Sequence, residues 1–96
     1  MITNIEELLK LYEIELNLDE KIQHDDYEGI GQTFVFRGAL LSELDSLTEE
    51  QYKKILKFEK IIEKYKDSLI ANYPQLKTTI NDGRLKLFDY FLQKVA

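Results

Sequence analysis

The clearest pattern along this chain is a stripe of apolar residues that recur at alternating steps of three and four positions. The stripe consists of Ile55, Phe58, Ile62, Tyr65 and Leu69. Because an α-helix completes a turn every 3.6 residues, side chains at this spacing share one face, which packs against other helices. The pattern therefore predicts a long helix with one face in a core.

Capping and turn residues set the expected ends of this helix. Thr48 and Gln51 have the spacing of a capping box, in which each side chain binds the free backbone amide of the other residue. Pro74 disfavours the helical conformation of the residue before it, which indicates an end near Asn72. We predict a helix over 49–72, about 36 Å long at 1.5 Å per residue.

A second amphipathic pattern occupies the N-terminal quarter of the chain. Thr3 and Glu6 have the spacing of a capping box ahead of it. Apolar residues follow on two adjoining faces: Ile5, Leu8, Leu9, Tyr12 and Leu16, then Leu11, Ile14, Leu18 and Ile22. This wide apolar arc predicts a helix from residue 3 or 4 to about 23 that touches more than one neighbour. Asn17 marks a kink in it.

Residues 24–31 form the least regular stretch, with three acidic side chains and two glycines. They predict a loop, or a helix start capped by Asp25 or Asp26. The β-branched and aromatic run that follows has strand propensity on its own. The apolar spacing beyond it nevertheless favours a helix over about 33–46. Gly38 within that helix costs about 1 kcal/mol relative to Ala, so we expect a neighbouring helix to pack closely against it.

The C-terminal segment, residues 75–96, carries a dense apolar pattern. One helical face holds Leu76, Ile80, Leu87 and Phe91, and the face beside it holds Leu85, Phe88, Leu92 and Val95. Asp82 and Gly83 interrupt the pattern and are also typical of the turn of a β-hairpin over 78–87. The apolar density after that point is too high for a two-stranded ribbon. We therefore predict a helix with a bend or break near Asp82 and Gly83.

Together these elements predict an all-α fold, a compact and mostly antiparallel bundle of about four helices in a single domain over residues 1–96. A chain of this length buries one modest core. Its 44% hydrophobic and 32% charged residues are typical of a globular protein. One proline and four glycines, three of them between positions 29 and 38, are too few and too clustered for the turns of a β-sandwich.

Charge and cysteine content narrow the possible functions. The net charge of −5 argues against nucleic acid as the principal partner, because phosphate binding draws on basic surfaces. The absence of cysteine excludes disulfides, thiolate metal sites and a cysteine nucleophile. No apolar run reaches the roughly 18–20 residues that span a bilayer. The N-terminal residues lack the pattern of a signal peptide, so we expect a cytoplasmic location and no membrane contact.

Residues that could carry catalysis are sparse. His24 is the single histidine, and Glu20 lies four positions before it, at a spacing that could place both on one helical face around a small metal or ligand site. Zinc sites need several histidine or cysteine ligands, however. Gly29 and Gly31 lack the third glycine and the lysine of phosphate-binding loops. We therefore expect no enzymatic activity, no metal and no cofactor.

Two surfaces are candidates for binding a partner. The run from Phe34 to Arg37 is the densest apolar patch, and four consecutive helical residues point to all sides, so Val35 or Phe36 should face outward. Four lysines, at 53, 57, 60 and 64, lie opposite the apolar stripe of the long helix, either as a basic ridge or as an ordinary exposed face. The candidate partner-binding residues are Tyr27, Val35, Phe36, Arg37, Lys53, Lys57, Lys60 and Lys64.

These features favour non-catalytic protein–protein binding over catalysis. Small, acidic helical domains of this class serve as adaptors, assembly factors, antitoxin or immunity proteins, and phage-encoded inhibitors of host defence. We expect a protein partner, or a homodimer that involves the helix carrying Val35 and Phe36. The alternatives are a nucleic-acid-associated subunit that uses the lysine ridge, and a helical bundle that binds a metal or ligand near Glu20 and His24.

Overall fold

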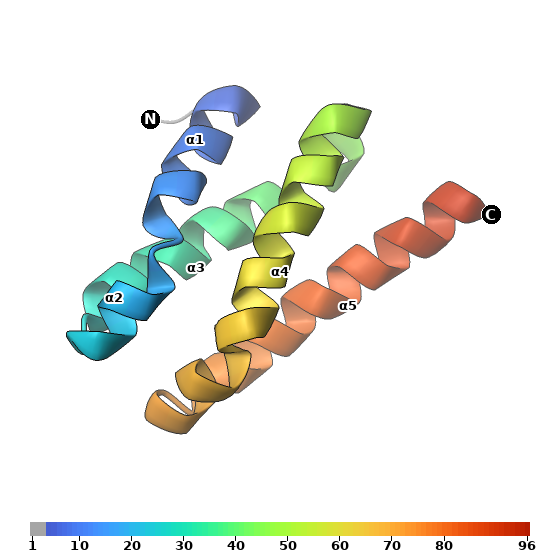
Figure 1. Cartoon of the computed structure of the whole chain (residues 1–96). Helices are drawn as coiled ribbons and strands as arrows, with labels where there is room; N and C mark the ends of the chain where they lie inside the picture. The colour runs from blue at the N-terminus through green and yellow to red at the C-terminus, as the bar shows by residue number, and fades with distance from the viewer. Residues whose placement is uncertain (1–3) are drawn as a thin grey trace.

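The computed structural model describes residues 4–96, which fold into five α-helices without a strand in that range (Figure 1). In chain order these are α1 (Ile5–Glu15), α2 (Leu18–Gln23), α3 (Tyr27–Leu41), α4 (Glu49–Asn72) and α5 (Leu76–Val95). A short 3-10 turn, η1 (Leu44–Ser46), links α3 to α4. The predicted all-α fold is confirmed.

The helix predicted from the N-terminus to about residue 23 is divided into α1 and α2. The side chain of Asn4 caps α1 by accepting a hydrogen bond from the backbone N–H of Glu7 at 2.9 Å. The cap predicted at Thr3 lies outside the described residues. The break falls at Leu16 and Asn17, so the kink predicted at Asn17 is a full interruption of the helix.

The start of α3 confirms the helix interpretation of the acidic stretch. Asp26 caps the helix, since its Oδ1 accepts a hydrogen bond from the backbone N–H of Gly29 at 3.0 Å. The helix therefore begins earlier than predicted, and it ends at Leu41 rather than near residue 46. The close neighbour predicted at Gly38 is wrong, because the residue is exposed and a Cβ built there would meet nothing within 4 Å.

The long helix α4 has the predicted ends and the predicted cap. Gln51 donates its backbone N–H to Thr48 Oγ1 at 3.2 Å, and Thr48 donates its own N–H to Gln51 Oε1 at 2.9 Å. Along the helix the apolar stripe faces the core. Four of its residues, Ile55, Phe58, Ile62 and Leu69, are buried and Tyr65 is half-buried.

The C-terminal helix α5 is continuous, so both the break predicted near Asp82 and Gly83 and the alternative hairpin are wrong. Gly83 is buried in mid-helix. A Cβ at this position would lie 2.5 Å from Cζ of Arg37. The glycine therefore makes room for a side chain of α3 instead of forming a turn.

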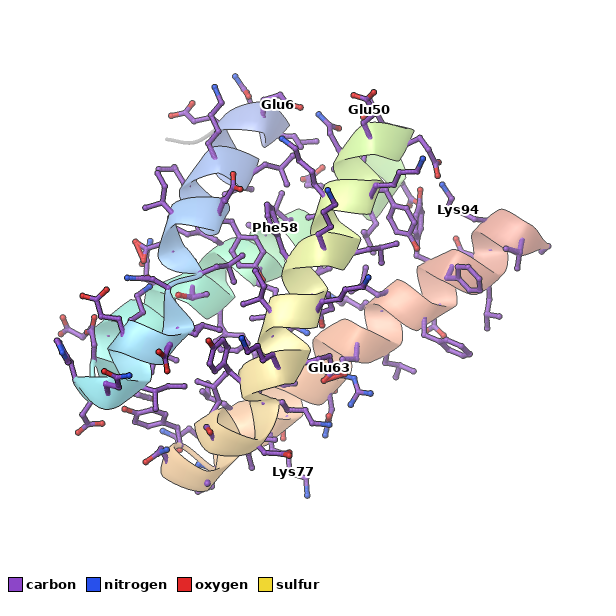
Figure 2. All side chains as sticks on the ribbon, viewed as in Figure 1. Glu6, Glu50, Phe58, Glu63, Lys77 and Lys94 are labelled. Atoms are coloured by element: carbon purple, nitrogen blue, oxygen red, sulfur yellow. The ribbon has the colours of Figure 1, made fainter. Side chains whose placement is uncertain are left out.

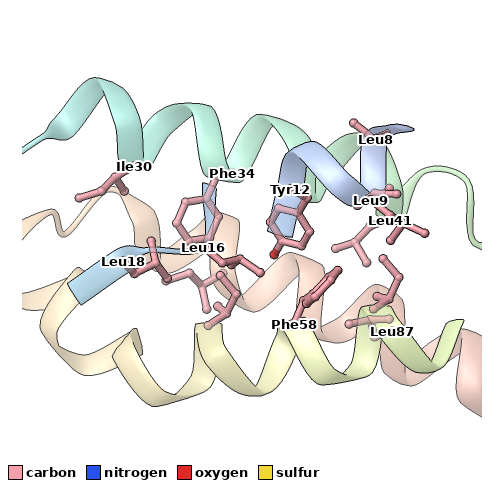
Figure 3. Packing of buried hydrophobic residues seen from close by; sticks show 14 of the residues in the cluster. Leu8, Leu9, Tyr12, Leu16, Leu18, Ile30, Phe34, Leu41, Phe58 and Leu87 are labelled. Carbon is pink, nitrogen blue, oxygen red and sulfur yellow. The ribbon is translucent and has the colours of Figure 1, made fainter. Parts of the chain in front are cut away.

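The core lies between α4 and the helices around it (Figure 3). Tyr12 of α1 and Phe58 of α4 meet edge to face, with ring centroids 5.5 Å apart. Leu18 of α2, Ile30 of α3 and Ile80 of α5 are fully buried in the same cluster. Each helix thus contributes to one core, as expected for a single small bundle.

The helices form a flattened body with principal extents of 40 × 28 × 19 Å. In Figure 1, α3 passes behind α4, and α4 and α5 run in roughly opposite directions and separate toward the C-terminus. Long side chains, among them Lys94 (Figure 2), extend from α5 there. Lys94 Nζ lies 2.5 Å from Oε2 of Glu49, at the start of α4. The rings of Tyr52 and Tyr90 also meet, at 5.2 Å. The outer half of α5 consequently has α4 on one side and solvent on the other.

Candidate functional site

A buried ammonium group holds together the break between α1 and α2 and the start of α3. Lys21 Nζ donates to the backbone oxygen and the Oε2 of Glu15 at 2.7 and 2.6 Å, and to Thr33 Oγ1 at 2.9 Å. The backbone oxygen of Gly29 lies 3.2 Å away. Because its donors are already engaged, Lys21 acts as a structural group.

The guanidinium of Arg37 is buried and joins three helices. It forms a bidentate ion pair with Glu59 of α4, and it also donates to the backbone oxygens of Thr79 and Ile80 on α5, both at 3.1 Å. Only 3% of Arg37 is exposed. The prediction that Arg37 contacts a partner is therefore wrong. Its place in an apolar run suggested exposure, whereas in the folded chain its guanidinium pairs with the mostly buried carboxylate of Glu59.

Tyr12 carries a buried hydroxyl without a hydrogen-bond partner among the described residues. Burial raises the pKa of this phenol above its ordinary value, and the nearby charge of Glu59 adds to the effect. Tyr12 is thus part of the core, with 1% of its surface exposed.

Tyr27 lies at a junction of three segments. Its ring packs against that of Tyr73 at 5.2 Å, and its hydroxyl accepts a hydrogen bond from Gln75 Nε2 at 3.0 Å. Tyr73 in turn donates to the carboxylate of Asp25, a residue with a left-handed backbone (φ 52°). The hydrogen bond to Asp25, together with burial, raises the pKa of Tyr73 to about 12. Tyr27 is 49% exposed, so one edge of this junction is accessible.

The histidine region offers no assembled metal site within residues 4–96. His24 caps the C-terminus of α2 and is exposed, as is Glu20 one turn earlier. No three side chains of histidine, aspartate or glutamate converge as metal ligands in the described part of the chain.

Val35 and Phe36 differ in their exposure. Val35 is 63% exposed, which agrees with the prediction that one of the two faces outward, whereas Phe36 is half-buried and packs against the core. Val35 borders a broad, open depression of about 700 Å³ that also carries Glu15, Asp26 and Glu28. Its polar and acidic lining argues against an apolar ligand pocket.

The four lysines at 53, 57, 60 and 64 are all exposed and follow one outer face of α4. None of them lies within 4.0 Å of a carboxylate in the described chain, whereas Lys66 and Arg84 pair with Glu63. We call these four residues the lysine ridge. The predicted position opposite the apolar stripe is confirmed, and the ridge remains open to a partner.

Among the described residues, the largest group of exposed apolar side chains on one helix lies on the outer side of α5, where the sequence had indicated no site. Phe88 is 57% exposed and Leu92 is 46% exposed, although both side chains are large and apolar. Their exposed neighbours are Leu85, Phe91 and Val95. We call these five residues the α5 face. Its signal in the sequence is a second apolar stripe beside the first, since one helix of a small bundle cannot bury both.

Two small hollows separate α3 and η1 from α5. They measure about 200 and 220 Å³ and share Leu41 and Lys86 in their walls. Both fall below the roughly 300 Å³ at which ligand pockets usually begin. Neither of these two hollows therefore has the volume of a typical ligand pocket.

Comparison with known protein families, curated proteins and solved structures gave no match to this chain. Within residues 4–96, each helix is too short or too polar to cross a membrane.

Proposed function

We propose that this chain acts by non-catalytic protein–protein binding and that the α5 face is its contact surface. The supporting observation is the exposure of Leu85, Phe88, Phe91, Leu92 and Val95 on one side of a single helix. Monomeric proteins rarely leave large contiguous apolar patches in water, and such large patches mark interaction sites. This mode of action suits an adaptor, an assembly factor or an inhibitor that occludes another protein.

The composition of the α5 face favours protein contact. Two phenylalanines supply large rigid side chains of the kind that anchor interfaces. Burial of apolar surface contributes roughly 25 cal/mol per Å², which favours association without a bound cofactor. The charged residues Arg84 and Asp89 flank the face, as polar rims flank the centres of interfaces.

Photo-cross-linking in cells that produce the protein tests this proposal. A photoreactive benzophenone amino acid at position 88 should capture a protein neighbour, visible as a band of defined mass on a denaturing gel. The same amino acid at Ile14, which is 70% exposed on α1, is the matched control. Equal labelling from both positions, or no defined adduct from position 88, would show that the α5 face is not a binding surface.

The lysine ridge supports a second candidate function, association with nucleic acid. Its four exposed ammonium groups lack carboxylate partners within the described chain, so they remain available to phosphates. Binding of a labelled duplex at 50 mM salt should weaken as salt is raised and should disappear in the variant Lys57→Glu, Lys60→Glu. Lys10→Glu, exposed on α1, is the charge control. A chain that binds no nucleic acid at low salt rules this candidate out.

A further inference from the structure

We propose that the α5 face takes a second copy of this chain, and that the two α5 helices pair in parallel as a short two-stranded coiled coil. This inference rests on the proposed function and names the occupant of its contact surface. The pattern of apolar and charged positions along α5 supports it, and the same pattern sets the orientation of the second copy.

The outward residues of α5 follow a heptad repeat, in which positions a and d form the seam between two helices. Leu85 and Leu92 take position a, and Phe88 and Val95 take position d. One heptad earlier the same positions hold the polar residues Thr78 and Asn81. The apolar seam therefore occupies the outer half of the helix, where α5 separates from α4 in Figure 1.

The buried residues of α5 occupy different heptad positions. Leu76 and Gly83 take position f, and Ile80 and Leu87 take position c. At 100° per residue the a and d side chains of the outer half fall within an arc of roughly 80°, whose centre lies roughly 130° from that of the buried face. A second helix can thus lie along α5 without displacing the core of its own bundle.

Charges beside the seam match in a parallel pair. Lys77 and Arg84 take position g, and Asp82 and Asp89 take position e. In a parallel coiled coil a residue at g faces the residue five positions later on the other helix. Lys77 then faces Asp82 of the second copy, and Arg84 faces Asp89 of the second copy. Two-fold symmetry repeats both pairs on the other side of the seam.

An antiparallel pair would bring like charges together. In that arrangement position g faces g and e faces e, so with the apolar residues of the two seams in register Asp89 would meet Asp89 of the second copy, and neither Lys77 nor Arg84 would face an aspartate. Like charges across a seam destabilise it and set orientation. The charge pattern therefore selects the parallel arrangement.

The groups needed for these pairs are accessible. Lys77, Asp82 and Asp89 are exposed and form no ion pair within the described chain. Arg84 is bound through Nε to Glu63 at 2.7 Å, and this contact orients a side chain that is 44% exposed. Its two Nη atoms are left to meet a second carboxylate.

Cysteine cross-linking tests the orientation, since the chain has no cysteine of its own. In Val95→Cys a parallel pair brings two d positions within the Cα separation that a disulfide needs. Oxidised glutathione should therefore convert this variant into a covalent dimer. Gln93→Cys, at the same end of α5 but on position b, should remain monomeric. Failure of Val95→Cys to cross-link, or equal cross-linking of both variants, overturns the parallel arrangement.

Sedimentation equilibrium over a concentration series tests whether two copies of the chain associate. The mass should rise with concentration from 11.4 kDa toward twice that value. Leu92→Glu should raise the dissociation constant at least about 100-fold, and Ile14→Glu should leave it unchanged. A monomer at every concentration overturns the proposal. If position 88 then still captures a protein of another mass in cells, the proposed function survives and only the second copy is excluded.

Discussion

Arg37 of α3 and Glu59 of α4 form a bidentate ion pair in the interior, with Nε to Oε1 at 3.0 Å and Nη2 to Oε2 at 2.6 Å. The side chains are 3% and 13% exposed. Because the same guanidinium also binds two carbonyl groups of α5, one side chain fixes the relative positions of three helices.

Glu59→Ala should destabilise the fold by about 3–5 kcal/mol, because it leaves the Arg37 guanidinium buried without its counter-charge. Chemical denaturation followed by circular dichroism measures this change. Glu49→Ala, which removes the exposed pair with Lys94, is the control and should leave the midpoint almost unchanged. An equal loss of stability in the two variants would show that the buried Arg37–Glu59 pair contributes no more to the fold than an exposed pair.

Two glycine substitutions should act in opposite directions. Gly38→Ala adds a methyl group to open space in a helix and should stabilise the protein by about 0.5–1 kcal/mol. Gly83→Ala places the same group against the Arg37 guanidinium, which four hydrogen bonds hold in place. This substitution should therefore destabilise the protein. Thermal unfolding of both variants measures the two changes in stability. A stabilised Gly83→Ala would mean that Arg37 moves aside freely.

The glycines also show where sequence reasoning stops. Local patterns predicted both ends of α4, because Thr48, Gln51 and Pro74 affect only the backbone of residues close to them in the sequence. The continuity of α5 depends instead on Arg37, which lies 46 positions before Gly83 and reaches it only in the folded chain. An Asp-Gly pair has the same local signature in a turn and in a helix that accommodates another side chain.

Stability should fall above pH 10, in part because of Tyr73. Its pKa of about 12 in the folded chain exceeds the ordinary value of 10.0, so the unfolded chain releases this proton first. The contribution of Tyr73 is complete below pH 10 and is lost as pH rises toward 12. In Tyr73→Phe, urea midpoints between pH 9 and 12 should decline less steeply. A slope in Tyr73→Phe identical to that of the unsubstituted protein would exclude this role for Tyr73.

Val35→Glu and Phe36→Glu should differ in their effect on folding. Val35 is exposed, so its replacement should leave the unfolding midpoint nearly unchanged, whereas Phe36→Glu puts a charge against the core and should lower it. Thermal unfolding separates the two. Light scattering then tests the sequence-based hypothesis that this helix mediates association: it stands if Val35→Glu dissociates an oligomer, and fails if the oligomer persists.

The candidate binding surface was only partly predictable. The spacing of Leu85, Phe88, Leu92 and Val95 identified a helical face, and the lysine ridge follows directly from helical periodicity. Which of two neighbouring apolar faces is buried depends on the direction in which α5 leaves α4. In the folded chain Gly83 lies against Arg37 of α3, and Tyr90 packs against Tyr52 of α4. Both contacts join residues far apart in the sequence, so local patterns do not indicate them.

The contact between the Arg37 guanidinium and Gly83 has a consequence for how this protein can change through evolution. A larger residue at 83 displaces the guanidinium of Arg37 from its present position, and loss of the cation at 37 removes the counter-charge of Glu59. In sequences that descend from this one, residues 37, 59 and 83 should therefore be retained together or replaced together, although they lie on three different helices.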